Sequence, residues 1–181
     1  LNRKLMDLAE ANNVDIFFNQ KCEYINWQNN EIHFSNMNDR STLSVVPDLI
    51  FGSDGAYSAA RLTHQLHHDR FQYQQYYIDF GYKELTIPAG ENGEFLLEKN
   101  ALHIWPRGNY MLIALPNLDG SFTCTLFFPF EGEPSFQSLD NTEKVRNFFN
   151  NTFADASRLM PTLETDFFQN ATSSLVTVKC F

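Results

Sequence analysis

The chain has 181 residues, 43% apolar and 19% charged, a balance that predicts a globular protein with a real core and excludes a disordered one. Its net charge of -9 and the lack of a basic stripe disfavour nucleic acid as a partner. The three cysteines, Cys22, Cys124 and Cys180, are far apart and lack metal-ligand spacing, which predicts reduced thiols and no metal. No run of about eighteen apolar residues is present to indicate a membrane span.

Residues 1–70 are expected to form a helix, a small antiparallel ribbon and a return strand. Leucines at helical spacing predict a helix that ends at Asn12 and Asn13. Residues 36–46 are expected to form a loop, and three strands are expected before it, at Val14–Phe18, Glu23–Trp27 and Glu31–Ser35. Both ends of the sequence fall within regular patterns, so we expect a piece of a longer protein.

The most informative segment is Pro47–Arg61. The apolar trio Leu49–Phe51 predicts a buried strand, two glycines permit a tight turn, and Ser58 is placed to open a helix. Asp54 therefore lies at the carboxyl end of a strand, where α/β sheets bind their ligands. Two interpretations stay open: Asp54 caps the helix, or it contacts a hydroxyl or water of a bound cofactor while Gly55 allows close approach of the backbone.

From residue 71 onward, alternating aromatic residues predict an antiparallel meander. Its strands are expected at Phe71–Tyr77, Tyr82–Pro88, Glu94–Leu97, Ala101–Pro106, Tyr110–Pro116 and Phe122–Pro129. A helix follows over Asn141–Phe153 with Asn141 as its cap, Glu164–Gln169 is ambiguous, and Leu175–Cys180 predicts a further strand. The fold class predicted is therefore α/β (α+β), with a boundary near residue 70.

One alternating set of side chains in the meander is expected to share a face of the sheet, because successive residues of a strand point to opposite sides. The set consists of Met111, Ile113, Leu115, Thr125 and Phe127. It forms either an ordinary sheet core or an apolar wall against a ligand. His103 is expected to be structural, since the sequence places no Ser, Cys or Asp to complete a triad with it.

The turn from Asp54 to Ser58, with Arg61, resembles the Asp-Gly fingerprint of the class A flavin-dependent aromatic hydroxylases. Further segments are similar to the kynurenine 3-monooxygenase family of that class, a fungal member in particular: Tyr82–Pro88, Leu102–Arg107, Ile113–Asn117 and Ser121–Phe127. The resemblance implies part of a Rossmann-like FAD-binding domain in residues 1–70, and an antiparallel-sheet substrate domain with flanking helices in residues 71–181.

The resemblance implies an FAD enzyme that uses NADPH and O2 to hydroxylate L-kynurenine at ring position 3, through a flavin C4a-hydroperoxide, in tryptophan catabolism toward NAD. Asp54, Gly55 and Cys22 would contact the FAD. The residues that would line the kynurenine pocket are Leu102, Met111, Ile113, Leu115, Thr125 and Phe127. No catalytic residue is assigned, and His103, Trp105 and Arg107 would remain structural.

The resemblance also implies a location on the cytosolic face of the mitochondrial outer membrane. A homodimer is one assembly open to the protein, but no feature of the sequence shows how many chains assemble. The family's Gly-rich phosphate loop and its membrane-associated helix would lie outside this chain, so the chain alone is expected to be inactive. Two alternatives stay open: a related flavin hydroxylase of another aromatic substrate, and a non-catalytic domain that binds an apolar ligand.

Overall fold

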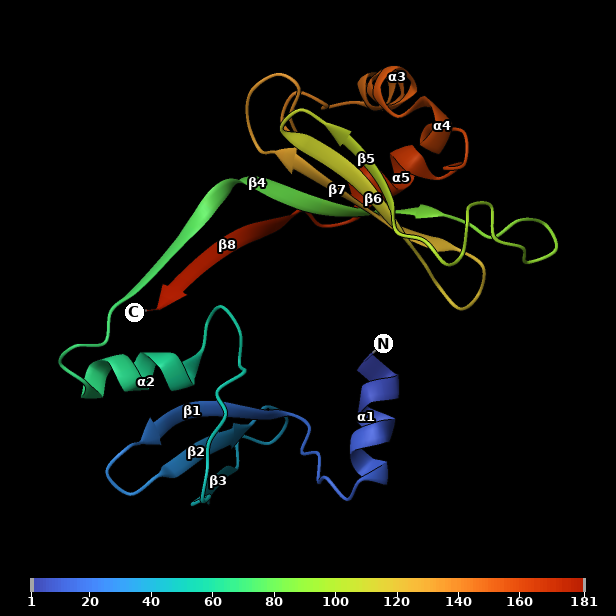
Figure 1. The fold of residues 1–181 in the computed structure, drawn as a ribbon. Helices are drawn as coiled ribbons and strands as arrows, with labels where there is room; N and C mark the ends of the chain where they lie inside the picture. Colours follow the sequence, from blue (N-terminus) through green and yellow to red (C-terminus); the bar gives the residue numbers. More distant parts are fainter. Residues whose placement is uncertain (1, 181) are drawn as a thin grey trace. The chain divides into compact units, whose positions relative to one another are not determined.

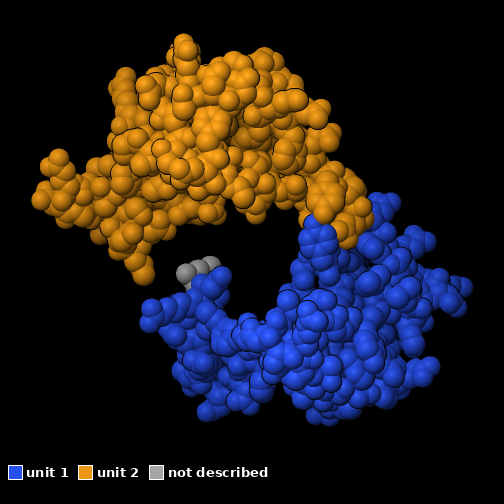
Figure 2. Space-filling model, turned by 180° about the vertical axis from the view of Figure 1, so that it is seen from behind, with its two compact units in different colours: residues 1–74, 178–181 blue, residues 75–177 orange. Residues whose placement is uncertain are grey.

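The computed structural model describes residues 2–180, which divide into two compact units (Figure 2). The first unit comprises residues 1–74 and 178–181, and the second comprises residues 75–177. Both combine helices with antiparallel sheets, which confirms the predicted mixed α/β class. The assignment of 1–70 to a cofactor domain and of 71–181 to a substrate domain stays a prediction.

The first unit consists of a small antiparallel sheet with two helices (Figure 1). Helix α1 precedes three strands paired in chain order, and α2 contacts the first of them. The bounds are α1 Asn2–Ala11, β1 Gln20–Asn26, β2 Glu31–Asn36, β3 Thr42–Val45 and α2 Ala59–His67. The predicted first helix and the β1–β2 ribbon are confirmed.

Three expectations for this unit are wrong. Val14–Phe18 is not a strand, because the Val14 amide donates back to the Ala9 carbonyl and closes the end of α1. The expected loop 36–46 contains β3, a short strand of four exposed residues that pairs with β2. Leu49–Phe51 is not a buried strand: within residues 2–180 no strand pairs with it, and Phe51 is 84% exposed.

The second unit consists of a five-stranded sheet with three helices on one face (Figure 1). The strand order is β5-β6-β7-β4-β8. The strands are β4 Tyr73–Ile87, β5 His103–Arg107, β6 Tyr110–Pro116, β7 Phe122–Pro129 and β8 Ser173–Cys180. The helices are α3 Thr142–Thr152, α4 Ala154–Ser157 and α5 Leu163–Gln169.

The meander prediction holds for β5, β6 and β7, whereas β4 pairs with β7 and not with the next strand in the chain. The two strands expected at Phe71–Tyr77 and Tyr82–Pro88 are one long strand. Glu94–Leu97 forms no strand: Phe95 and Leu97 pack onto the core and Leu96 is exposed, but the segment pairs with none of the described strands. The predicted Asn141 cap is confirmed by its side-chain oxygen, which accepts from the Lys144 amide at 3.0 Å.

The core lies between the sheet and the helices. Leu112 and Ala114 of β6 and Leu126 of β7 are fully buried against α3–α5, where Phe149 and Phe153 meet them. Apolar burial of this kind contributes about 25 cal/mol per Å², which makes this packing the main source of stability in the unit. The many phenylalanines thus serve aromatic packing, as their number predicted.

Lys83 is a buried cation on the helix-covered side of β4. Its ammonium donates to the Phe167 carbonyl at 2.6 Å and to the Asn170 carbonyl at 3.0 Å, at the C-terminal end of α5. Burial lowers the pKa of Lys83. A helix C-terminus favours a nearby cation, so this contact holds the end of α5 against β4.

The two sides of β6 should respond differently to truncation. Leu112→Ala is expected to lower the free energy of unfolding by about 2–5 kcal/mol, because it opens a cavity in the core. The neighbouring Met111→Ala, on the exposed side, is expected to cost less than about 1 kcal/mol. Urea denaturation followed by circular dichroism measures both, and equal losses would contradict the assignment of faces.

Candidate functional site

The Asp54 carboxylate lies at the N-terminus of α2. One oxygen accepts from the Ser58 hydroxyl at 2.5 Å, and the other accepts from the Ala60 amide at 3.1 Å. Ser58 is itself the N-cap, and its hydroxyl oxygen accepts from the Arg61 amide at 2.9 Å. The capping interpretation of Asp54 is therefore confirmed, while contact with a cofactor stays a prediction.

Two opposing effects determine the pKa of Asp54. Partial burial disfavours the charged form, but hydrogen bonds from Ser58 and from the amides at the start of α2 outweigh it and hold the pKa below its usual value. The carboxylate is therefore ionised at neutral pH. Its two oxygens offer about four acceptor positions, so capacity remains for a ligand hydroxyl.

Arg61 fixes the turn from the side of the helix. Its guanidinium donates to the carbonyls of Gly55 and Ala56, and it lies over the Tyr73 ring at 5.4 Å. Gly55 has φ +80, a conformation that favours glycine, and apart from its two chain neighbours no residue comes within 4 Å of where a side chain would begin. The turn therefore presents bare backbone to open space.

A cavity of about 260 Å³ brings two of the three predicted cofactor residues together within the first unit. Cys22 of β1 and Asp54 both line it. Burial raises the pKa of the Cys22 thiol, and the Asp54 charge adds to this effect. The remaining lining is largely apolar: Ile25, Ile32, Phe34, Ile50, Phe51, Gly52, Ser53 and Ala60. Gly55 follows Asp54 directly but does not line the cavity.

The predicted substrate residues lie on the side of the second unit's sheet that α3–α5 do not cover. Met111 faces Phe127 across β6 and β7, and Ile113 faces Thr125. We call this side the open face; on β4–β7 it carries Tyr82, Glu84, Thr86, Ile104, Met111, Ile113, Leu115, Thr123, Thr125 and Phe127. Leu102 directly precedes β5 and is exposed. The ordinary-core interpretation of this set is wrong, because the core occupies the opposite face.

Sequence reasoning missed five of these ten members of the open face, and three of the five contact or pair with the predicted set. Ile104 pairs with Ile113, Glu84 pairs with Thr125, and the Tyr82 ring centroid lies 6.2 Å from that of Phe127. Alternation along β4 could have indicated which of its side chains share one face of the sheet. It could not have shown that β4 lies beside β7.

The structural role expected for His103, Trp105 and Arg107 agrees with their contacts. The His103 ring bonds the Glu98 carbonyl at 2.9 Å, and the Trp105 indole donates to Asp155 at 2.7 Å. Arg107 donates to the Thr152 carbonyl at 2.9 Å. All three interactions are made within the second unit and away from the open face.

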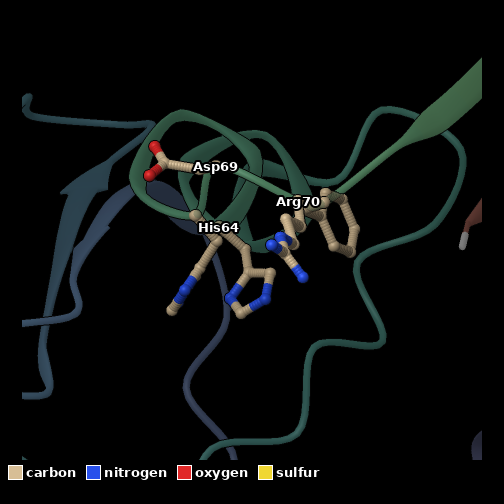
Figure 3. Close-up of a pocket in the computed structure, with 5 residues that line it drawn as sticks. His64, Asp69 and Arg70 are labelled. Atoms are coloured by element: carbon tan, nitrogen blue, oxygen red, sulfur yellow. The ribbon is translucent and has the colours of Figure 1, made fainter.

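A second cavity of the first unit, of about 460 Å³, lies at the end of α2 (Figure 3). His64, His68, Asp69, Arg70 and Phe71 line it. The His64 and His68 rings lie 4.1 Å apart. Partial burial and the neighbouring histidines lower the pKa of His64. Within residues 2–180 no group of three or more His, Cys, Asp or Glu residues is arranged to hold a metal ion.

Comparison with known proteins identifies relatives along the whole chain. No protein-family model matches it. The kynurenine 3-monooxygenase of Flavobacterium psychrophilum is 50% identical over 100% of this chain and 40% of its own length. The enzyme of the same name from Dictyostelium discoideum is 50% identical over 99% of this chain and 38% of its own.

The chain is homologous to one segment of the kynurenine 3-monooxygenases. It spans about 40% of the length of these relatives. A pig kynurenine 3-monooxygenase is 47% identical over 78% of the chain. The fungal source expected from the sequence stays a prediction.

Solved structures with a similar fold are found along almost the whole chain. A tetrameric form of 2-methyl-3-hydroxypyridine-5-carboxylic acid oxygenase covers 97% of the chain, with a TM-score of 0.63 and 17% identity. Klebsiella pneumoniae HpxO, solved with FAD and uric acid, covers 98% with a TM-score of 0.50 and 16% identity. The chain spans 44% and 41% of these two structures. At such identities the likeness concerns the fold alone.

Asp54→Asn tests the electrostatic role of the turn. Because the folded-state pKa is lowered, the carboxylate stabilises the fold above its unfolded pKa and ceases to do so as the pH falls through the folded value. We expect a loss of about 1 kcal/mol at neutral pH that vanishes in acid. Asp48→Asn, at an exposed site in the preceding loop, is the control. Denaturant titrations across pH 2–7 measure both, and a pH-independent difference would contradict the assignment.

Proposed function

We propose that the protein to which this chain belongs is an FAD-dependent monooxygenase that hydroxylates L-kynurenine to 3-hydroxy-L-kynurenine with NADPH and O2. The observation that carries the proposal is the 45–50% identity to kynurenine 3-monooxygenases across the full chain. The product places the reaction in tryptophan catabolism, on the route to pyridine nucleotides.

The first unit offers a surface suited to part of the FAD. Its largely apolar cavity suits a flat heteroaromatic ring, and the Asp54 carboxylate retains acceptor capacity for a hydroxyl. The bare backbone at Gly55 permits close approach of a ligand. When bound, FAD supplies the redox chemistry with NADPH and O2. The residues that we expect to hold it here are Cys22, Asp54 and Gly55.

The open face suits an aromatic substrate. Met111, Ile113 and Phe127 provide apolar contact for a ring, and Thr125 adds one hydroxyl among them. The contribution expected of Leu102 and Leu115 is likewise contact and exclusion of water. These residues orient the ring, and none of them is proposed as an acid or a base.

Activity is proposed for the longer protein and not for residues 1–181 alone. The chain spans about 40% of its relatives, and Ile25 is the one apolar side chain of the first unit that is buried among the described residues. Leu49 and Phe51 expose large apolar surfaces, as expected of residues that further segments cover.

The family resemblance also supports a location on the cytosolic face of the mitochondrial outer membrane, with membrane contact through segments outside this chain, and we propose a homodimer as the assembly to be tested. Among residues 2–180 no helix is long and apolar enough to cross a bilayer. The location and the membrane contact are proposals that rest on the resemblance.

The function is tested on the full-length protein. We expect a yellow flavin spectrum and NADPH oxidation that L-kynurenine accelerates, with 3-hydroxy-L-kynurenine identified by mass spectrometry. A panel of other aromatic compounds serves as the control. A flavoprotein that another aromatic stimulates and kynurenine does not would favour a related hydroxylase. A full-length protein without flavin would favour a non-catalytic binding domain, and either result would overturn the proposal.

A further inference from the structure

Among the residues that the described strands β4–β7 contribute to the open face, Glu84 is the one that carries a carboxylate. Its neighbours on this face are apolar or carry hydroxyl groups, so it is the single fixed charge there. The side chain is exposed, on a stretch of β4 that alternates between buried and exposed positions. A lone charge in such a surface is a candidate for recognising one polar group of a ligand.

Glu84 borders the residues expected to hold the substrate ring. Its register partner on β7 is Thr125, which in turn faces Ile113 on β6. Neighbouring strands lie about 4.8 Å apart, and directly opposed side chains begin about 5 Å apart. A ring that rests on Ile113 and Thr125 therefore brings its substituents within reach of the Glu84 carboxylate.

No cation neutralises this carboxylate within residues 2–180. The described structure gives its oxygens no hydrogen bond and no ion pair. Lys83, the preceding residue, points to the opposite side of the sheet, where its ammonium donates to the carbonyls of Phe167 and Asn170. The acceptor capacity of Glu84 is thus available to a ligand.

Space for a ligand group exists beside Glu84. A cavity of about 430 Å³ at the edge of β4 is lined by Tyr82, Glu84, Gln169, Asn170, Ala171 and Ser173. Its wall is held in place from two sides. The Asn170 side chain donates to the Glu84 carbonyl at 2.8 Å, and Lys83 holds the end of α5. The Glu84 carboxylate therefore lies between the apolar residues of the open face and this largely polar cavity.

We propose that Glu84 is a specificity-determining residue whose carboxylate accepts a hydrogen bond from the ring amine of an aromatic substrate. This inference rests on the proposed function and deepens it, because kynurenine carries an amine on its ring. The ring amine is favoured over the side-chain ammonium, because the ring is the part that the apolar wall contacts. Covering the carboxylate with a ring that lacks a donor would leave a charge without a partner, at a cost in affinity.

The test uses the intact flavoprotein and its Glu84→Gln and Glu84→Ala variants. Isothermal titration calorimetry measures the Kd of L-kynurenine and of its analogue with hydrogen in place of the ring amine. Two further ortho-amino aryl ketones are each paired with the counterpart that lacks the amine. Glu131→Gln, at an exposed site after β7, is the matched control.

For the wild-type protein we expect each amine to bind more tightly than its counterpart. Glu84→Gln is expected to weaken binding of the amines by about 10–100-fold, in line with a hydrogen bond to a charged group. Binding of the counterparts is expected to stay the same or to tighten, because the variant removes the charge that they leave without a partner. Glu131→Gln should change neither. Thermal unfolding of each variant checks that the fold persists.

Two results would overturn the proposal. One is an equal loss of affinity for the amines and their counterparts in the Glu84 variants, which indicates a structural role. The other is no loss of affinity for either. Wild-type protein that binds both members of each pair equally would overturn it as well. If the variants discriminate amines as expected while L-kynurenine is not hydroxylated, the proposed function fails and the role of Glu84 stands.

Discussion

The burial of one face of the five-stranded sheet against α3–α5 is the constraint on which the rest of the second unit depends. Leu112 and Leu126 must point into the helices, so strand geometry directs Ile113 and Thr125 to the opposite side. Because the aromatic core stabilises this arrangement, the exposed side is free to carry residues chosen for a ligand. Stability and recognition are thus assigned to alternate residues of the same strands.

In the first unit, the turn that we expect to contact FAD lies at the N-terminus of α2. The interactions that cap α2, from Asp54 and Ser58, also hold the turn at Gly55 in an open conformation. One set of hydrogen bonds therefore fixes both the helix and the backbone that we expect to approach FAD. The functional proposal needs no change in this geometry when a cofactor binds.

Much of the second unit could be predicted from the sequence, because alternation and caps are local signals. The strands β5–β7 and the Asn141 cap follow from them. The position of β4 beside β7 could not be predicted in this way, because it depends on pairing between residues about forty positions apart. Glu84 was missed for this reason: its importance comes from Thr125 on the neighbouring strand.

The first unit was predicted less well, since most of its apolar side chains are not buried in a core within the unit. Leu49–Phe51 has the composition of a buried strand, but in the described residues it pairs with no strand and is largely exposed. In β3 the opposite holds: residues 36–46 have the polar composition of a loop, but pairing with β2 makes a strand of Thr42–Val45. The amino-acid composition of a segment indicates whether it favours a buried or an exposed environment. Whether the segment forms a strand depends on a neighbouring strand with which it can pair.

A crystal structure of the full-length protein with FAD and L-kynurenine would test the central claim most directly, namely that the open face forms the substrate wall. We predict that the kynurenine ring contacts Met111, Ile113 and Phe127, and that FAD approaches the cavity that Cys22 and Asp54 line. A kynurenine ring bound elsewhere, with the open face covered by another part of the protein, would contradict the account.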